Sequence, residues 1–203
     1  MRAVITEEDI PASGDLRIPA DAIITPSARD LARDRGVRLI ELPKGSQPDS
    51  AAAGKTIAIG SDHGGFRLKE RLKPIFAELK LTLIDVGVTE EKPADYPDIA
   101  EQVALRIVEG KAERGVIVDG AGIGSAMAAN KIPGIRAALC YDRASARNSR
   151  EHNNANVLTL GGRLLTESQA EEVLRTWLET PFAGGRHQAR VQKISEIEKR
   201  YAK

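Results

Sequence analysis

The stretch Val116–Ser125 constrains the fold more than any other part of this sequence. It begins with a short apolar run, which is typical of a buried β-strand, and then carries glycine at every second position, 120, 122 and 124. Ala126, Ala128 and Ala129 follow, as expected for a small-residue helix that packs closely on a sheet. A strand that passes through a glycine turn directly into a helix predicts an α/β fold.

The glycine turn is also a candidate anion site. Gly120, Gly122 and Gly124 leave room for a ligand to approach the backbone, and successive N–H groups at the start of a helix favour a negative charge. The alternative is a turn that only packs the helix on the strand, because the spacing is neither that of a dinucleotide-binding turn nor that of a phosphate loop. Asp119 ends the strand, which is where open α/β sheets place their chemistry.

Residues 55–203 repeat the alternation of strand and helix. Apolar runs predict strands over 56–60, 81–86, 116–119, 135–140 and 157–160, with helices between them. We therefore expect a Rossmann-like, five-stranded parallel sheet sandwiched by helices. A last helix from about residue 187 has no strand after it, which favours packing on a second subunit; the alternative is packing on its own sheet.

Residues 1–42 are predicted to form a small N-terminal module. Strands are expected over 1–6 and 37–42, and a helix over 27–35, with Thr25 as its cap and Pro26 at its first position. A module of this size buries little core by itself, so it is expected to pack on another part of the assembly. Residues 43–54 have the Pro, Gly, Ser and Ala content of a linker, and the domain of 55–203 follows.

Composition excludes several classes of function. A net charge of +1 and only 3% aromatic residues argue against a nucleic-acid-binding surface. No apolar run reaches the roughly 18 residues of a membrane span and no signal peptide is present, so we expect neither a membrane protein nor an exported one. The single cysteine, Cys140, suits a reducing cytoplasm.

Polar side chains gather at the carboxyl ends of the predicted strands, at the end of the helix before the fifth strand, and on the last helix. Arginines four residues apart on a helix can converge on one anion, and a carboxylate with an imidazole can move a proton. Singly, such residues are more often a solvated surface or a structural histidine; around a glycine turn they predict a site for a phosphorylated small molecule. The residues are Asp62, His63, Asp119, His152, Asn153, Arg163, Arg186 and Arg190.

Seven short motifs lie in order along residues 55–201. They are Ser61-Asp-His-Gly-Gly65, Asp95-Tyr-Pro97, Gly122-Ile-Gly124, Ala128-Ala-Asn-Lys131, Glu151-His-Asn-Asn154, Gly161-Gly-Arg163 and Gly185-Arg-His-Gln188. In combination they resemble the type B ribose-5-phosphate isomerase family, which also includes the galactose-6-phosphate isomerase subunits. Within it, His152 and the Gly185–Gln188 motif favour the ribose-type members.

The resemblance implies an aldose–ketose isomerisation of a pentose 5-phosphate through an enediolate, without cofactor or metal. The site would lie between two subunits of a homodimer or of a dimer of dimers. The implied catalytic residues are His152 for opening the furanose ring and Asp62 for the sugar hydroxyls, and Asp119 lies at the position of the proton-moving base. The implied binding residues are His63, Arg163, Arg186 and Arg190 around the phosphate, Gly120, Gly122, Gly124 and Ser125 at the enediolate oxygen with Asn130 close by, and Tyr96 and Asn153 lining the site.

The position of the family's proton-moving base differs in this sequence. Many members carry cysteine at the position of Asp119 and threonine or serine at that of Ala121, whereas another branch carries glutamate at the position of Ser125. Cys140 lies on the next strand and does not match that base. We therefore take Asp119 as the base, because a carboxylate can shuttle a proton between adjacent carbons, although aspartate reaches less far than glutamate.

Two other functions stay open. The changed base position is compatible with another pentose phosphate or with a tetrose or hexose phosphate as substrate. A catalytically silent sugar-phosphate-binding protein would keep the arginines and lose proton transfer, but it would need neither His152 nor a carboxylate at position 119.

The N-terminal module carries a resemblance of its own. Residues 17–29 are similar to the start of the ethanolamine-utilisation cobalamin adenosyltransferase, a protein associated with bacterial microcompartments. The resemblance implies an assembly or targeting module, with shell or cargo proteins of a microcompartment as partners, and carries over no cobalamin chemistry. The alternative is an extra layer that only stabilises the dimer.

Overall fold

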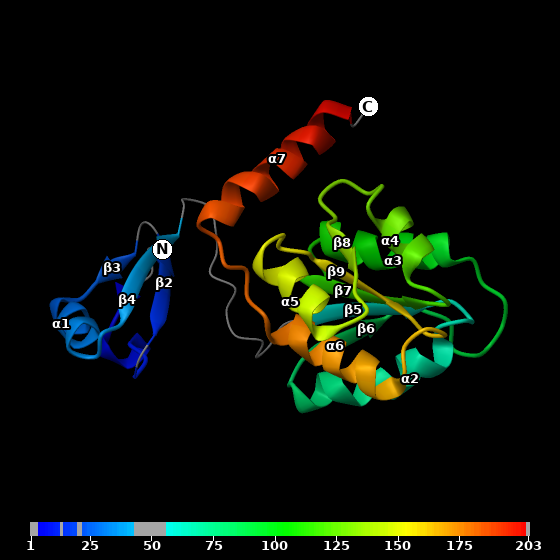
Figure 1. Cartoon of the computed structure of the whole chain (residues 1–203), viewed down its shortest axis with the longest axis horizontal. Coiled ribbons are helices and arrows are strands. Elements are labelled where there is room, and N and C mark those ends of the chain that lie inside the picture. The colour runs from blue at the N-terminus through cyan, green and yellow to red at the C-terminus, as the bar shows by residue number, and fades with distance from the viewer. Residues whose placement is uncertain (1–3, 13, 20–21, 43–55, 202–203) are drawn as a thin grey trace. The chain divides into compact units, whose positions relative to one another are not determined.

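The computed structural model describes residues 4–12, 14–19, 22–42 and 56–201 (Figure 1). The chain separates into two compact units, residues 1–50 and residues 51–203. The predicted linker, 43–54, lies outside the described residues, and the boundary between the units falls within it.

The N-terminal unit is a small α/β structure with its own core. Thr25 caps its helix as predicted, since its hydroxyl accepts the backbone N–H of Ala28 at 3.3 Å. Two strands lie within the expected ranges, β1 (Val4–Ile5) and β4 (Arg38–Leu42), and each pairs in parallel with an additional strand, β3 (Ile23–Ile24) and β2 (Asp15–Pro19) respectively. Nothing in the sequence pattern predicts β2 and β3, because proline at the end of β2 and after β3 is typical of loops and β3 has only two residues. The elements are β1 (Val4–Ile5), the 3₁₀-helix η1 (Glu7–Asp9), β2 (Asp15–Pro19), β3 (Ile23–Ile24), α1 (Pro26–Asp34) and β4 (Arg38–Leu42).

The C-terminal unit has the predicted fold. Its five strands are all parallel in the order β6-β5-β7-β9-β8. The strands are β5 (Thr56–Ser61), β6 (Thr82–Asp85), β7 (Arg114–Asp119), β8 (Ala137–Leu139) and β9 (Val157–Gly161). The helices are α2 (Phe66–Glu78), α3 (Tyr96–Val108), α4 (Ile123–Ala129), α5 (Arg143–Glu151), α6 (Glu167–Glu179) and α7 (Arg186–Tyr201).

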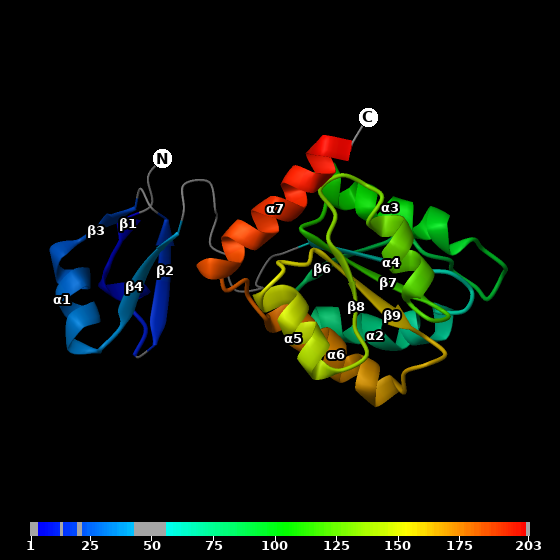
Figure 2. The ribbon, with the colours of Figure 1, turned by 45° about the horizontal axis from the view of Figure 1, so that its top comes forward.

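Helices cover both faces of the sheet because the strands are apolar on both faces. On β7, Val116 and Val118 face the core beneath α2 and α6, whereas Ile117 faces the core beneath α3 and α4. This is the two-residue period of a strand buried on both faces. Figure 2 shows the two helical layers on opposite sides of the sheet.

The last helix, α7, is the least buried of the helices in the C-terminal unit. Its only buried residues are His187 and Val191, and the apolar side chains of Ile194, Ile197 and Tyr201 are 46%, 53% and 75% exposed. It contacts its own unit through Glu198, whose carboxylate accepts the backbone N–H of Gly134 at 2.9 Å. Packing of α7 on a second subunit stays a prediction. No helix in the described part of the chain is long and apolar enough to cross a membrane.

Candidate active site

Three turns interlock at the carboxyl edge of the sheet. The turn after β9 joins the turn after β7, because Gly162 N–H donates to the Asp119 carbonyl at 2.7 Å. The turn after β5 closes on the other side, where Asp62 accepts the backbone N–H of Gly65 at 2.9 Å. A Cβ atom on Gly65 would lie 1.9 Å from the Val118 carbonyl oxygen, so only glycine permits this approach. The edge therefore brings residues of three separate motifs together.

The carboxylate of Asp119 sits at the N-terminus of α4 and is only 4% exposed. One oxygen accepts the backbone N–H groups of Ala121, at 2.7 Å, and of Gly122. The other accepts the backbone N–H of Ser125, at 3.0 Å, and the Ser125 hydroxyl. Gly122 adopts a left-handed conformation, φ 79°, to make this turn.

The glycine turn thus binds an anion, and that anion is the chain's own carboxylate. Donors at the N-terminus of a helix stabilise a negative charge, which explains why an aspartate is tolerated at a buried position. Asp119 can take a proton from a substrate only if one of these hydrogen bonds is exchanged or weakened. Ser125 contacts the candidate base through both its backbone N–H and its hydroxyl.

A polar pocket of about 360 Å³ opens beside this turn. Its wall includes Arg163, whose side chain lies along the turn, since a Cβ on Gly120 would be 3.8 Å from its Cδ. His63 Nδ1 accepts the backbone N–H of Ala94 at 3.4 Å, so Nε2 carries the ring proton in this arrangement. The pocket is lined by His63, Gly64, Arg67, Leu68, Glu91, Gly162 and Arg163.

Tyr96 lies against the other side of the glycine turn. A Cβ atom on Gly124 would come within 2.5 Å of the Tyr96 ring, so the ring packs directly on the glycine. The side chain keeps substantial exposure, 42%, as required of a residue that lines a site open to ligand.

A second group of predicted site residues lies between α5 and α7. The rings of His152 and His187 stack with centroids 4.2 Å apart. Asn148 Nδ2 contacts Nδ1 of His152 at 2.8 Å, and Arg186 Nε donates to Nε2 of His187 at 3.4 Å. Burial, reinforced by the charge of His152 and the neighbouring arginines, lowers the pKa of His187.

The two groups lie in different parts of the unit. In Figures 1 and 2, α7 begins on the far side of the unit from the start of α2, which begins at Phe66, three residues after His63 in the chain. We call the first group, Asp62, His63, Asp119 and Arg163, the carboxyl-edge group. Within a single chain, His152 and Arg186 therefore lie apart from it.

Asn130 is predicted to lie near the glycine turn, and the structure places it at the opposite end of α4 from that turn. It follows the last residue of α4, about 10 Å of helix from the turn at the start. Its amide donates to the Ala137 carbonyl at 2.9 Å and accepts the Ala137 N–H at 2.7 Å, so it pairs with the edge strand β8. Sequence alone could not show that this short edge strand needs a side chain as hydrogen-bond partner.

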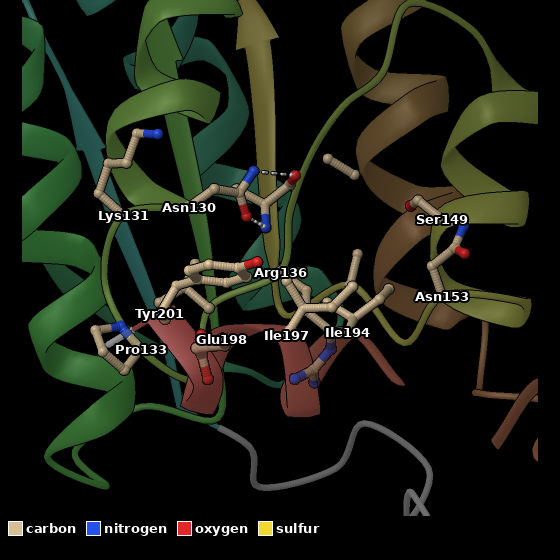
Figure 3. Close-up of a pocket in the computed structure, with 14 residues that line it drawn as sticks. Asn130, Lys131, Pro133, Arg136, Ser149, Asn153, Ile194, Ile197, Glu198 and Tyr201 are labelled. Atoms are coloured by element: carbon tan, nitrogen blue, oxygen red, sulfur yellow. Dashed lines mark hydrogen bonds between the residues drawn. The ribbon is translucent and has the colours of Figure 1, made fainter. Parts of the chain in front are cut away.

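Asn130 and Asn153 instead line a wider, largely apolar pocket of about 730 Å³ (Figure 3). One wall comes from α7, which contributes Ile194, Ile197 and Tyr201. The polar groups of this pocket include Arg136, whose pKa is lowered by burial.

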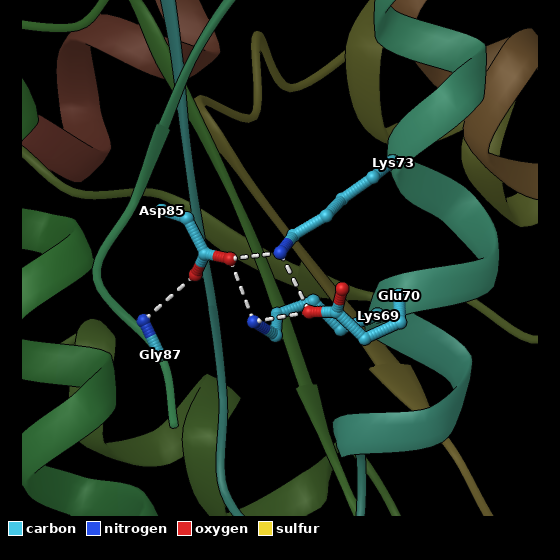
Figure 4. Close-up of polar contacts among 5 residues, drawn as sticks. All are labelled: Lys69, Glu70, Lys73, Asp85 and Gly87. Atoms are coloured by element: carbon cyan, nitrogen blue, oxygen red, sulfur yellow. Dashed lines mark hydrogen bonds and ion pairs between the residues drawn. The ribbon is translucent and has the colours of Figure 1, made fainter. Parts of the chain in front are cut away.

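An ionic cluster beside the site has no counterpart among the predicted residues (Figure 4). Lys69, on α2, is fully buried and contacts Asp85 at 2.7 Å and Glu70 at 2.9 Å. Lys73 contacts the same two carboxylates at 2.6 Å each. Asp85 also accepts the backbone N–H of Gly87 at 3.0 Å, which ties the loop after β6 to α2. A lysine adjacent to the apolar positions of an amphipathic helix was the only signal in the sequence.

No group of three or more histidine, cysteine, aspartate or glutamate side chains able to hold a metal ion occurs among residues 4–12, 14–19, 22–42 and 56–201.

The C-terminal unit matches one protein family. The model described as Ribose/Galactose Isomerase matches residues 57–194. The chain is 42% identical over 146 residues to ribose-5-phosphate isomerase B of Escherichia coli (strain K12), covering 72% of this chain and 98% of that protein. It is 40% identical over 145 residues to D-erythrulose-4-phosphate isomerase of Pectobacterium atrosepticum, covering 70% and 95%.

The solved structures agree. The structure of Clostridium thermocellum ribose-5-phosphate isomerase B superimposes with a TM-score of 0.71 at 46% sequence identity, covering 72% of this chain and 99% of that one. The N-terminal unit lies before the segment that the family model matches.

Proposed function

This chain belongs to the ribose/galactose isomerase family, and on that premise we propose that it interconverts ribose 5-phosphate and ribulose 5-phosphate through an enediolate. The observation that carries the proposal is the carboxyl-edge group, in which a buried carboxylate, a glycine turn and an arginine–histidine pocket adjoin one another. A carboxylate next to an anion pocket suits proton transfer between the carbons of a bound sugar phosphate.

Each residue of the group has a proposed role. Asp119 moves the proton between C1 and C2, and Ser125 holds the carboxylate in place. Asp62 binds sugar hydroxyls, while His63 and Arg163 bind the phosphate. Tyr96 covers the turn at Gly120–Gly124, and the backbone N–H groups of this turn that do not donate to Asp119 face the enediolate oxygen.

We propose that a second copy of the chain completes the site. His152, Asn153, Arg186 and Arg190 lie with α5 and α7, apart from the carboxyl-edge group, and α7 exposes apolar side chains that a homodimer would cover. In such a dimer His152 assists ring opening and the two arginines reach the phosphate bound by the partner. A dimer of dimers retains the same arrangement.

Mixing two inactive variants tests this arrangement. Asp119→Asn and His152→Asn each remove activity from a different half of the site. Co-refolded in equal amounts, half of the dimers carry both variants, and one of their two sites is intact. We expect about a quarter of wild-type turnover to return. No recovery would show that each chain contributes both residues to one site.

A tetrose phosphate is the second candidate substrate. It is favoured by the 40% identity to D-erythrulose-4-phosphate isomerase of Pectobacterium atrosepticum. Initial rates with ribose 5-phosphate and with a tetrulose 4-phosphate, measured on the same enzyme, discriminate between them. A sugar-phosphate-binding protein without turnover would bind both and convert neither.

We propose that residues 1–42 are an assembly module that places the isomerase in or near a bacterial microcompartment. The support is that this segment has a core of its own, centred on Ile10, Ala28, Ala32 and Val37. Deletion of residues 1–50, followed by imaging with labelled shell proteins, tests the proposal. Unchanged localisation would leave only a stabilising role for the module.

A further inference from the structure

Arg67 and Glu91 close one side of the pocket that contains His63 and Arg163. Arg67 is the second residue of α2, and Glu91 lies in the loop between β6 and α3. The two side chains form a two-pronged ion pair: Nη2 donates to one carboxylate oxygen at 3.1 Å and Nε to the other.

This ion pair is exchangeable. The side chain of Arg67 is 85% exposed and that of Glu91 is 43% exposed. Exposed pairs contribute little to stability, because water solvates both partners well when they separate. Arg67 can therefore leave Glu91 whenever a better anion is within reach, and a phosphate offers a guanidinium the same two-pronged geometry.

The pocket places opposite charges on the path of an entering anion. His63 Nε2 and Arg163 offer donors, Arg67 adds a cation, and Glu91 adds a negative charge. A phosphate dianion is attracted by Arg67 and repelled by Glu91, which also occupies the donors of Arg67.

We infer that Arg67 is an additional phosphate-binding residue and that Glu91 holds it back in the unbound protein, so that the pair sets the affinity of this pocket for the substrate's phosphate. The inference rests on the proposed function only for the identity of the natural ligand. The preference for a phosphate group follows from the pocket itself.

Titration of inorganic phosphate against the full-length protein, followed by ³¹P NMR, tests the inference without any turnover. Arg67→Gln should weaken binding about 3- to 10-fold, because one charge-assisted contact is lost. Glu91→Gln should strengthen it about 2- to 3-fold, since a repulsive charge is removed and Arg67 is released. If the ion pair only fixed the loop, either substitution would break the same contact and would change the phosphate affinity in the same direction. Opposite changes in affinity therefore distinguish the two roles.

A neighbouring pair supplies the matched control. Lys92 and Glu90 lie on the same loop, 2.6 Å apart, and neither lines the pocket. Lys92→Gln and Glu90→Gln make the same changes of charge and should alter phosphate affinity by less than about 1.5-fold, since solvent screens exposed charges.

Two outcomes overturn the inference: shifts of the same sign in Arg67→Gln and Glu91→Gln, or shifts no larger than those of the controls. In steady-state kinetics the same variants should raise and lower KM, respectively, with kcat unchanged. If phosphate affinities follow the predicted signs but no sugar phosphate is converted, the proposed function fails and the inference holds. If sugar phosphate is converted normally but the phosphate affinities do not change in the predicted directions, the inference fails and the proposed function holds.

Discussion

Replacing Asp85 by asparagine should lower the stability of the C-terminal unit by about 3 kcal/mol. The reason is Lys69, whose side chain is 0% exposed and whose ammonium group is neutralised by Asp85 at 2.7 Å and Glu70 at 2.9 Å. Asparagine keeps the shape of the side chain and can still accept the N–H of Gly87, so the change removes mainly the charge. Breaking a buried ion pair from one side costs about 3–5 kcal/mol. The low end applies because Glu70 remains and the Asp85 side chain is 24% exposed.

Thermal unfolding measures the effect. For a protein of this size 1 kcal/mol moves Tm by about 2–4 °C, so Asp85→Asn should lower Tm by about 6–12 °C. Glu78→Gln, which removes the same charge from an exposed pair with Arg175, should change stability by less than about 0.5 kcal/mol. Adding Lys69→Met to Asp85→Asn removes the stranded ammonium and should recover most of the loss. A loss no larger than that of Glu78→Gln, or no recovery in the double variant, would refute the reasoning.

The same cluster predicts a pH dependence. Burial raises the pKa of Asp85, but the hydrogen bonds from Lys69 and Lys73 outweigh this effect and hold the pKa below its ordinary value. The unfolded chain therefore binds more protons than the folded one as the pH falls, so the stabilisation is present above the ordinary pKa and is lost below it. The difference between the wild type and Asp85→Asn should be full at neutral pH and shrink below about pH 4. A difference that is constant down to pH 2 would contradict this linkage.

Three other changes have defined outcomes. Gly124→Ala should push the Tyr96 ring aside, because the new Cβ would lie 2.5 Å from the ring. KM for the sugar phosphate should rise about 10-fold with little change in Tm, and an unchanged KM would place Tyr96 outside the site. His152→Asn should raise the pKa of His187 in an NMR titration, because the stacked imidazole helps to lower it; an unchanged midpoint would leave burial as the whole cause. Deletion of residues 1–50 should leave turnover intact, since the C-terminal unit has separate cores; loss of turnover would assign the module a part in the site.

The parallel sheet could be predicted because its strands are continuous apolar runs such as Val116–Val118, and each is followed by an amphipathic helix. Strand ends then fix which residues meet, so Asp62, Asp119 and Arg163 could be expected at one edge. Strands β2 and β3 escaped prediction because pairing over a few residues is decided by the tertiary context.

The details of the site depend on contacts that periodicity does not encode. The glycine turn predicts an anion-binding site, but only the structure shows that the carboxylate of Asp119 itself accepts the N–H groups at the start of α4. Likewise, Arg67 and Glu91 are ordinary charged residues in the sequence, 24 positions apart, and a loop brings them together at the pocket. Asn130 belongs to a recognised motif, yet its amide pairs with a strand instead of facing the turn.

The most direct test of the central proposal is solvent-deuterium exchange, followed by ¹H NMR, into ribose 5-phosphate, ribulose 5-phosphate and a tetrulose 4-phosphate. If the chain isomerises a pentose phosphate with Asp119 as its base, the wild type should incorporate deuterium at C1 or C2 of the pentose phosphates, and Asp119→Asn should abolish this exchange. Exchange that continues in Asp119→Asn would contradict the assignment of the base. Absence of exchange with every sugar phosphate, despite binding, would contradict the isomerase itself.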